Sequence, residues 1–163
     1  SHIEGKTYAD LVNMKISTYV LPYHAHSYSI TSVLPMLYDL CQADSTKCYM
    51  DSYAEFAWKD WQTILADKAT SETEFMNAWG KKVADAFPGV SASDVANVIN
   101  SSKDKYQSDY RTREDFKYGS SVGVSGTPSA IVNGVKLDDV PETAEDWKSL
   151  IAEIYPAPKT NMF

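Results

Sequence analysis

Apolar and polar residues alternate in one short segment near the start of the chain and recur at helical spacing over a much longer region. Residues 14–21 alternate at Ile16, Thr18 and Val20, are rich in β-branched side chains and are closed by Pro22. Such alternation is typical of a half-buried strand, and proline is tolerated only at a strand's ends or edges. We therefore predict a strand that ends at residue 21.

The middle of the chain, from residue 27 to residue 118, has the apolar spacing of amphipathic helices. Pro35 interrupts the first of these helices and is expected to kink it. Ser71 and Glu74 have the spacing of a capping box at the start of the third, and Pro88-Gly89 stops it. The pattern predicts four helices with approximate bounds 27–41, 53–65, 71–87 and 91–118.

After Gly119 the pattern changes to short apolar runs separated by glycine. Residues 130–132 and 135–137 flank Asn133-Gly134, the dipeptide most typical of a two-residue hairpin turn. We predict a hairpin here, followed by a last helix that opens at Thr143-x-x-Asp146 and is ended by Pro156.

Composition excludes some classes of partner. The chain has 163 residues, 15 Lys and Arg against 22 Asp and Glu, a formal net charge of −7 and a sequence pI of about 4.9. Binding to a polyanion calls for a basic face, so nucleic acid is not expected as a partner. No apolar run approaches the length of a membrane span, so membrane insertion is not expected either.

The two cysteines, Cys41 and Cys48, lack the spacing of a zinc or Cys-x-x-Cys redox site. In one continuous helix they would lie about 10 Å apart along the axis, too far for a disulfide. The polar residues 42–47 could turn the chain back, so a disulfide and two packed thiols both remain open. Asn100-Ser101-Ser102 matches the acceptor tripeptide for N-linked glycosylation, a pattern common by chance that does not decide the compartment.

The segment 123–134 is the most specific motif, because it places the Thr127-Pro128 bond just before a predicted strand. An X-Pro bond can be cis, and proline has no N–H, so the edge of the strand is left open there. An open edge can pair with an extended peptide. The simpler alternative is that Pro128 only ends a loop.

Segment 123–134 resembles the cis-proline loop and hairpin of the DsbA-like branch of the thioredoxin superfamily. Three further segments resemble eukaryotic secretory-pathway members of this family, and the similarity covers roughly residues 8–155. They are Leu21-Pro22-Tyr23-His24, the stretch 109–118, and Glu145-Asp146-Trp147-Lys148.

The resemblance implies an α/β thioredoxin-like fold with a helical insertion, and a secreted or secretory-lumen location. The thioredoxin-like sheet and final helix would comprise residues 14–26 and 119–155, and the insertion residues 27–118. Residues 1–13 would be a scar or the tail of the first helix, and 156–163 a C-terminal tail.

The chain departs from the family at the redox turn. The family's first strand and its Cys-Pro-x-Cys or Cys-Pro-x-Ser turn should precede Met14, yet no cysteine does. A competing alignment puts residues 21–24 on that turn with both cysteines replaced, but no second strand would then precede the helical block. Either way the thiolate that disulfide exchange requires is missing from its place.

Three functional hypotheses follow. The first is a thioredoxin-like protein without a redox cysteine pair that binds a peptide or partner protein at the proline loop, with no cofactor. The second is the C-terminal portion of a thiol-disulfide oxidoreductase whose cysteine turn lies upstream. The third, a relative of kappa glutathione transferases, would need glutathione. The candidate partner-binding residues are Ser125, Gly126, Thr127, Pro128, Tyr23 and His24.

The histidines, tryptophans and clustered acidic residues could belong to functional sites, but each has a simpler structural explanation. His24 and His26 lack nearby Cys, Asp or Glu in the sequence, so no metal site is expected, and His24 is expected to hydrogen-bond a backbone carbonyl. The spacing of the tryptophans favours core packing over an aromatic binding platform. The acidic residues between 138 and 146 are expected to form a solvated cluster at a helix start. The tryptophans are Trp58, Trp61, Trp79 and Trp147.

Overall fold

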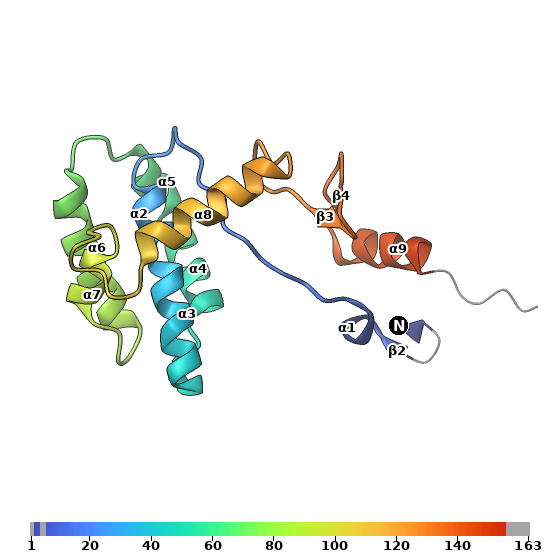
Figure 1. The fold of residues 1–163 in the computed structure, drawn as a ribbon, viewed down its shortest axis with the longest axis horizontal. Coiled ribbons are helices and arrows are strands. Elements are labelled where there is room, and N and C mark those ends of the chain that lie inside the picture. The colour runs from blue at the N-terminus through green and yellow to red at the C-terminus, as the bar shows by residue number, and fades with distance from the viewer. Residues whose placement is uncertain (1, 4–5, 156–163) are drawn as a thin grey trace, which may run out of the picture. The chain divides into compact units, whose positions relative to one another are not determined.

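The computed structural model describes residues 2–3 and 6–155, and most of its elements are helices (Figure 1). The chain divides into two compact units. Thr18–Gly126 forms the helical unit, and the described residues of Ser1–Ser17 and Thr127–Phe163 form the hairpin unit. The boundaries expected at 26/27 and 118/119 therefore differ from this division, which falls at 17/18 and 126/127.

The helical unit contains seven described α-helices and one short 3-10 helix. Its core lies among α3, α4, α5, α6 and α7 and is formed by side chains such as Met36, Tyr53, Met76 and Trp79. The elements are α2 (Ser27–Thr31), α3 (Val33–Ala43), η1 (Ser45–Lys47), α4 (Met50–Lys59), α5 (Trp61–Ala66), α6 (Glu72–Ala86), α7 (Ala92–Asn97) and α8 (Ser108–Ser121).

Helix α6 confirms the predicted capping box. The Ser71 hydroxyl accepts a hydrogen bond from the Glu74 amide, and the Glu74 carboxylate accepts one from the Ser71 amide. The two side chains thereby satisfy amide groups that have no partner inside the helix. The helix packs closely on α7, because a Cβ at Gly80 would lie 2.4 Å from the carbonyl oxygen of Ala92.

The first predicted helix is divided at Ser32 rather than kinked at Pro35. Helix α2 ends at Thr31 and α3 begins at Val33, which places Pro35 in the first turn of α3. Amides in the first turn have no partner within the helix, so proline removes no hydrogen bond there. The second predicted helix is divided in the same way, into α4 and α5 at Asp60.

The prediction of one helix over 91–118 is wrong, because α7 ends at Asn97 and α8 begins at Ser108. Between them, the side chain of Asn100 accepts from the Ser102 amide and that of Asp104 from the Tyr106 amide. Short polar side chains that bond nearby amides in this way compete with the helix for the same groups.

The strand predicted for 14–21 is absent, since residues 12–21 form neither helix nor strand. A strand needs a partner strand, whereas Thr18 and Tyr19 contact helix α8 instead. The Tyr19 ring stacks on Phe116 of α8 with centroids 4.9 Å apart, and the Thr18 hydroxyl donates to Asp115 over 3.2 Å. Ile16, by contrast, is 79% exposed.

The hairpin unit contains the predicted hairpin and last helix. Its two described sheets each have two antiparallel strands, which pair His2 with Thr7 and Val132 with Val135. Its described elements are β1 (His2–Ile3), β2 (Lys6–Thr7), α1 (Tyr8–Leu11), β3 (Ile131–Val132), β4 (Val135–Lys136) and α9 (Ala144–Ile154).

The hairpin turn and the start of α9 have the chemistry that the sequence predicts. Asn133 and Gly134 have φ values of 50° and 85°, the left-handed region that a two-residue hairpin turn requires. Thr143 and Asp146 form a capping box at the start of α9. Pro156, expected to end this helix, lies outside the described residues, and α9 ends at Ile154.

Candidate functional site

The loop that leads to Pro128 begins with a specific helix ending. The Val124 amide donates to the Gly119 carbonyl over 2.9 Å, and the Gly123 amide donates to the Ser120 carbonyl over 3.1 Å. Gly123 has a φ of 83°, so α8 ends in a Schellman motif that needs a residue free to adopt the left-handed region.

The candidate loop residues belong to two units. Ser125 and Gly126 are the last residues of the helical unit, whereas Thr127 and Pro128 are the first of the hairpin unit's second segment. The Thr127-Pro128 peptide bond is cis, as the proline motif allows. Ser125, Thr127 and Pro128 are exposed and Gly126 is half-buried.

Pro128 lines a cavity of about 950 Å³ in the hairpin unit. Four carboxylates share this lining, so its formal charge is strongly negative near neutral pH. Three come from the segment between β4 and α9, and Asp146 comes from the first turn of α9, where the helix dipole favours acidic residues. The other lining residues are Asp138, Asp139, Val140, Pro141, Glu142 and Asp146.

Strand β3 of the hairpin pairs with β4 along one edge, and its other backbone edge faces away from β4. Leu137 donates a 2.9 Å hydrogen bond to Ala130, which identifies these two as a hydrogen-bonded pair. Because hydrogen-bonded and non-hydrogen-bonded pairs alternate in antiparallel strands, the next pair, Ile131 with Lys136, is of the second kind. The N–H and C=O of Ile131 therefore point to the outer edge of β3, where the described sheet has no further strand.

Tyr23 and His24 line a different cavity, of about 550 Å³, in the helical unit. Their rings meet edge to face with centroids 4.7 Å apart. Trp61, Gln62 and Lys68 contribute to the same lining from α5 and the segment that follows it. Of the six candidate residues, Tyr23 and His24 therefore line this cavity and Pro128 lines the other. The candidates Ser125, Gly126 and Thr127 line neither.

The prediction that all four tryptophans pack in the core is wrong for Trp58 and Trp61. Their side chains are 70% and 40% exposed and stack on each other with centroids 5.5 Å apart. Trp79 is buried as expected, and Trp147 is half-buried. Trp58 follows Phe56 and Ala57, which cover the core face of α4, so the turn of the helix carries it to the solvent side.

His26 is buried and lies between two carboxylates. Its Nδ1 is 3.1 Å from an oxygen of Glu72, and its Nε2 is 3.7 Å from an oxygen of Asp67. The ring stacks on Phe75 with centroids 3.9 Å apart. The pKa of Asp67 is lowered, first by the backbone amide of Thr70 and to a smaller extent by His26.

This cluster ties the start of α2 to the start of α6, and the Ser29 hydroxyl also donates to Glu72. The sequence missed it, because the acidic partners lie more than 40 residues along the chain from His26. Among the described residues, no group of three or more His, Cys, Asp and Glu has the arrangement of a metal site.

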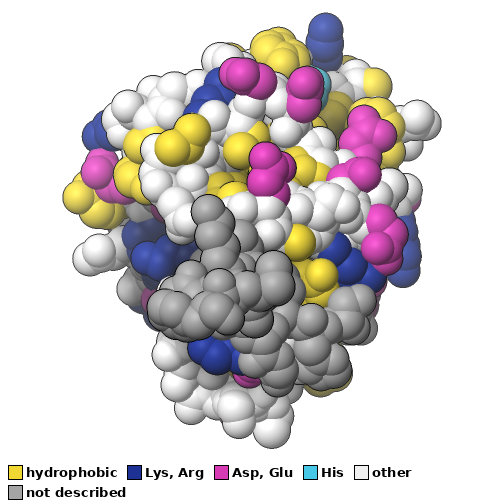
Figure 2. Space-filling model, turned by 90° about the vertical axis from the view of Figure 1, so that its right-hand side faces the viewer, with side chains coloured by type: hydrophobic (Ala, Val, Ile, Leu, Met, Phe, Trp, Pro, Cys, Tyr) yellow, Lys and Arg dark blue, Asp and Glu magenta, His cyan; other side chains and the backbone are white. Residues whose placement is uncertain are grey.

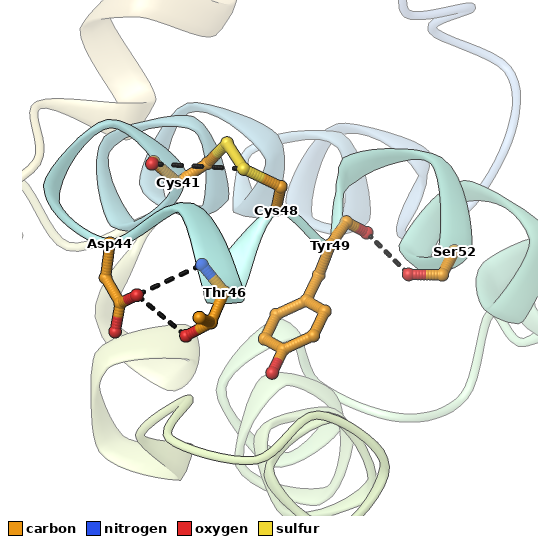
Figure 3. Close-up of a disulfide and its surroundings, with 6 residues drawn as sticks. All are labelled: Cys41, Asp44, Thr46, Cys48, Tyr49 and Ser52. Atoms are coloured by element: carbon orange, nitrogen blue, oxygen red, sulfur yellow. Dashed lines mark hydrogen bonds between the residues drawn. A yellow bond between two sulfur atoms is a disulfide. The ribbon is translucent and has the colours of Figure 1, made fainter.

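Cys41 and Cys48 are joined in a disulfide with their Cα atoms 4.3 Å apart (Figure 3). The chain turns back because α3 ends at Ala43 and η1 begins at Ser45. Asp44 fixes this turn by accepting hydrogen bonds from the amide and hydroxyl of Thr46, as the dashed lines in Figure 3 show. Neither cysteine is therefore a free thiol in this structure.

The distribution of surface charge bears on nucleic-acid binding, and the length and apolar character of the helices bear on membrane insertion. On the face shown in Figure 2, acidic, basic and hydrophobic side chains of the described residues are interspersed, without a continuous basic area. None of the described helices combines the length and the apolar character that crossing a bilayer requires.

Comparison of this chain with protein-family models, with curated proteins and with solved structures found no match.

Proposed function

We propose that the chain is a thioredoxin-like protein without a redox cysteine pair that binds an extended peptide, or an extended segment of a partner protein, beside Pro128. The observation that carries the proposal is the outer edge of β3, where the N–H and C=O of Ile131 face away from β4. Edge groups of this kind bind an extended chain by adding it to the sheet as another strand.

The acidic residues of the cavity predict which side chains a bound peptide should carry. Pro128 and four carboxylates line the same space, so a lysine or arginine of the bound peptide has a favourable position there. Charge pairs at such an exposed cavity contribute mainly to the rate of association and to specificity, and they weaken as salt screens them. The favoured partner is therefore an extended peptide with basic side chains.

Binding of labelled peptides tests the proposal. Extended peptides that contain lysine would be compared with the same peptides carrying glutamate, using fluorescence anisotropy at low and high salt. Pro128→Ala and the double variant Asp139→Asn/Glu142→Gln are each expected to weaken binding of the lysine peptides by about tenfold, equivalent to about 1.4 kcal/mol. Asp85→Asn, an exposed carboxylate of α6, is the matched control and should leave binding unchanged.

Amide hydrogen exchange separates strand addition from simple charge attraction. The Ile131 amide should exchange with solvent in the free protein and become protected when the peptide is bound. A Pro128→Ala protein that binds every peptide as the unmodified chain does would count against the proposal. Binding without protection of Ile131 would exclude the strand-addition geometry.

A further inference from the structure

Asn100-Ser101-Ser102 lies in the segment between α7 and α8, and all three residues are exposed. An oligosaccharide attached to asparagine is bulky and needs a surface position. The tripeptide is also the single place in the sequence where Ser or Thr stands two residues after an Asn, with a residue other than proline between them.

The turn brings together the two side chains that define the acceptor tripeptide. The Ser102 hydroxyl donates a 2.8 Å hydrogen bond to the carboxamide oxygen of Asn100, and the Ser102 amide donates to the same oxygen over 3.3 Å. The Asn100 backbone carbonyl accepts from the amides of Lys103 and Asp104, over 2.8 and 2.9 Å. The carboxamide is therefore held at the surface beside the hydroxyl that an asparagine-modifying transferase reads.

The residues that follow fasten this segment to α7. The ammonium of Lys105 lies 2.9 Å from Asp94, and the Tyr106 hydroxyl is 3.2 Å from the same carboxylate. These contacts are made by residues that follow Asp104 in the sequence. The tripeptide takes no part in them and stays exposed. A large substituent on Asn100 would replace no contact with the core.

A second, independent observation concerns the compartment. Both cysteines of the chain are joined in the Cys41–Cys48 disulfide. Structural disulfides form and persist in oxidising compartments, of which the endoplasmic reticulum is one, and are rare in the cytosol. Asparagine glycosylation takes place in that same lumen, so the disulfide agrees with exposure of the tripeptide to the modifying enzyme.

We propose that Asn100 is a site of N-linked glycosylation. The donor is a lipid-linked oligosaccharyl diphosphate. A bond forms between Nδ2 of Asn100 and C1 of the first sugar, and the bond between C1 and the diphosphate oxygen breaks. The lipid diphosphate leaves with that electron pair, and a base of the transferase takes the proton from Nδ2. This proposal stands on the tripeptide and the disulfide and does not rest on the proposed peptide binding.

Expression of the full chain through the secretory pathway of a eukaryotic cell tests the assignment. The intact mass should exceed the sequence mass by that of an oligosaccharide, and peptide N-glycosidase should remove the excess. Digestion in water enriched in heavy oxygen converts the modified asparagine to labelled aspartate, which locates it in a peptide map. The label should appear at Asn100.

Variants provide the controls. Asn100→Gln and Ser102→Ala should each abolish the added mass, whereas Ser101→Ala and Ser102→Thr should retain it, because the middle position is free and threonine supplies the same hydroxyl. An unmodified secreted chain, from cells that glycosylate a reporter protein normally, would overturn the proposal. So would an added mass that survives in the Asn100→Gln protein.

Discussion

The indole Nε1 of Trp79 donates a 3.0 Å hydrogen bond to the hydroxyl oxygen of Tyr53, and both side chains are buried. The Tyr53 hydroxyl in turn donates to the backbone carbonyl of Ile30 over 2.8 Å. One phenol thereby connects α4 to α6 and to α2. Burial raises the pKa of Tyr53, so the group stays neutral and can keep both bonds.

Replacing Tyr53 with phenylalanine should lower the free energy of unfolding by about 1–3 kcal/mol, because the buried Trp79 N–H loses its acceptor. Urea unfolding followed by circular dichroism measures the change. Tyr110→Phe removes a hydroxyl from a side chain that is 61% exposed and should change stability by about 0.5 kcal/mol or less. Equal effects of the two variants would contradict this account of the core.

Gly80 of α6 lies directly against the backbone of α7. An alanine there would put its Cβ 2.4 Å from the Ala92 carbonyl oxygen, so the two helices must separate. Gly80→Ala should therefore destabilise the helical unit by about 1–3 kcal/mol, although alanine is the better helix former. Asn77→Ala, on the exposed face of the same helix, should be neutral or stabilising. A stabilised Gly80→Ala protein would show that the two helices are not in contact there.

The Cys41–Cys48 disulfide closes a short loop, with a sequence separation of 7. The loop-entropy relation gives a stabilisation of roughly 2.5 kcal/mol for a loop of this length. The double variant Cys41→Ser/Cys48→Ser should unfold at lower urea concentration, and the unmodified chain should match it once a reductant is added. Insensitivity of the unmodified chain to reductant would mean that the cysteines are not joined in solution.

Acid should weaken the capping box of α6. Hydrogen bonds from the hydroxyl and amide of Ser71 lower the pKa of Glu74 below its ordinary value of 4.5. Because the pKa is lower in the folded than in the unfolded chain, the stabilisation is complete above the unfolded value and is lost as pH falls through the folded one. Glu74→Gln should thus cost stability near neutral pH and match the unmodified chain in acid.

Urea unfolding at a series of pH values measures this convergence. Glu55→Gln removes the same charge from an exposed position of α4 that caps no helix, and serves as the matched control. A difference between Glu74→Gln and the unmodified chain that stays constant, or grows, towards low pH would be the wrong sign for a carboxylate with a lowered pKa.

Local signals predicted local structure well. Ser71 with Glu74, Thr143 with Asp146, and Asn133-Gly134 each specify a cap or turn through contacts within a few residues, and all three are present. The helix predicted over 91–118 failed for the same physical reason, because Asn100 and Asp104 bond nearby amides and stop it. Asn and Asp also occur inside helices, so the sequence alone does not predict which of them will bind nearby amides and end the helix.

Local patterns did not predict features that depend on contacts between residues far apart in the sequence. The alternation in 14–21 indicated a strand, but strand pairing is a tertiary property. Residues 14–21 form no strand, and Thr18 and Tyr19 contact α8. The exposed pair Trp58 and Trp61 was missed because helical spacing alone does not say which faces of α4 and α5 meet the core. The thioredoxin-like assignment remains a prediction.

The sequence by itself determined the helical character of the middle of the chain, the hairpin turn, the two capping boxes and the acidic charge, since each depends on neighbouring residues or on composition alone. Only the tertiary structure decided that Cys41 meets Cys48, that His26 lies between Asp67 and Glu72, and that Pro128 shares a cavity with four carboxylates. These relationships depend on where the backbone turns back and which faces pack together, and no local pattern encodes either.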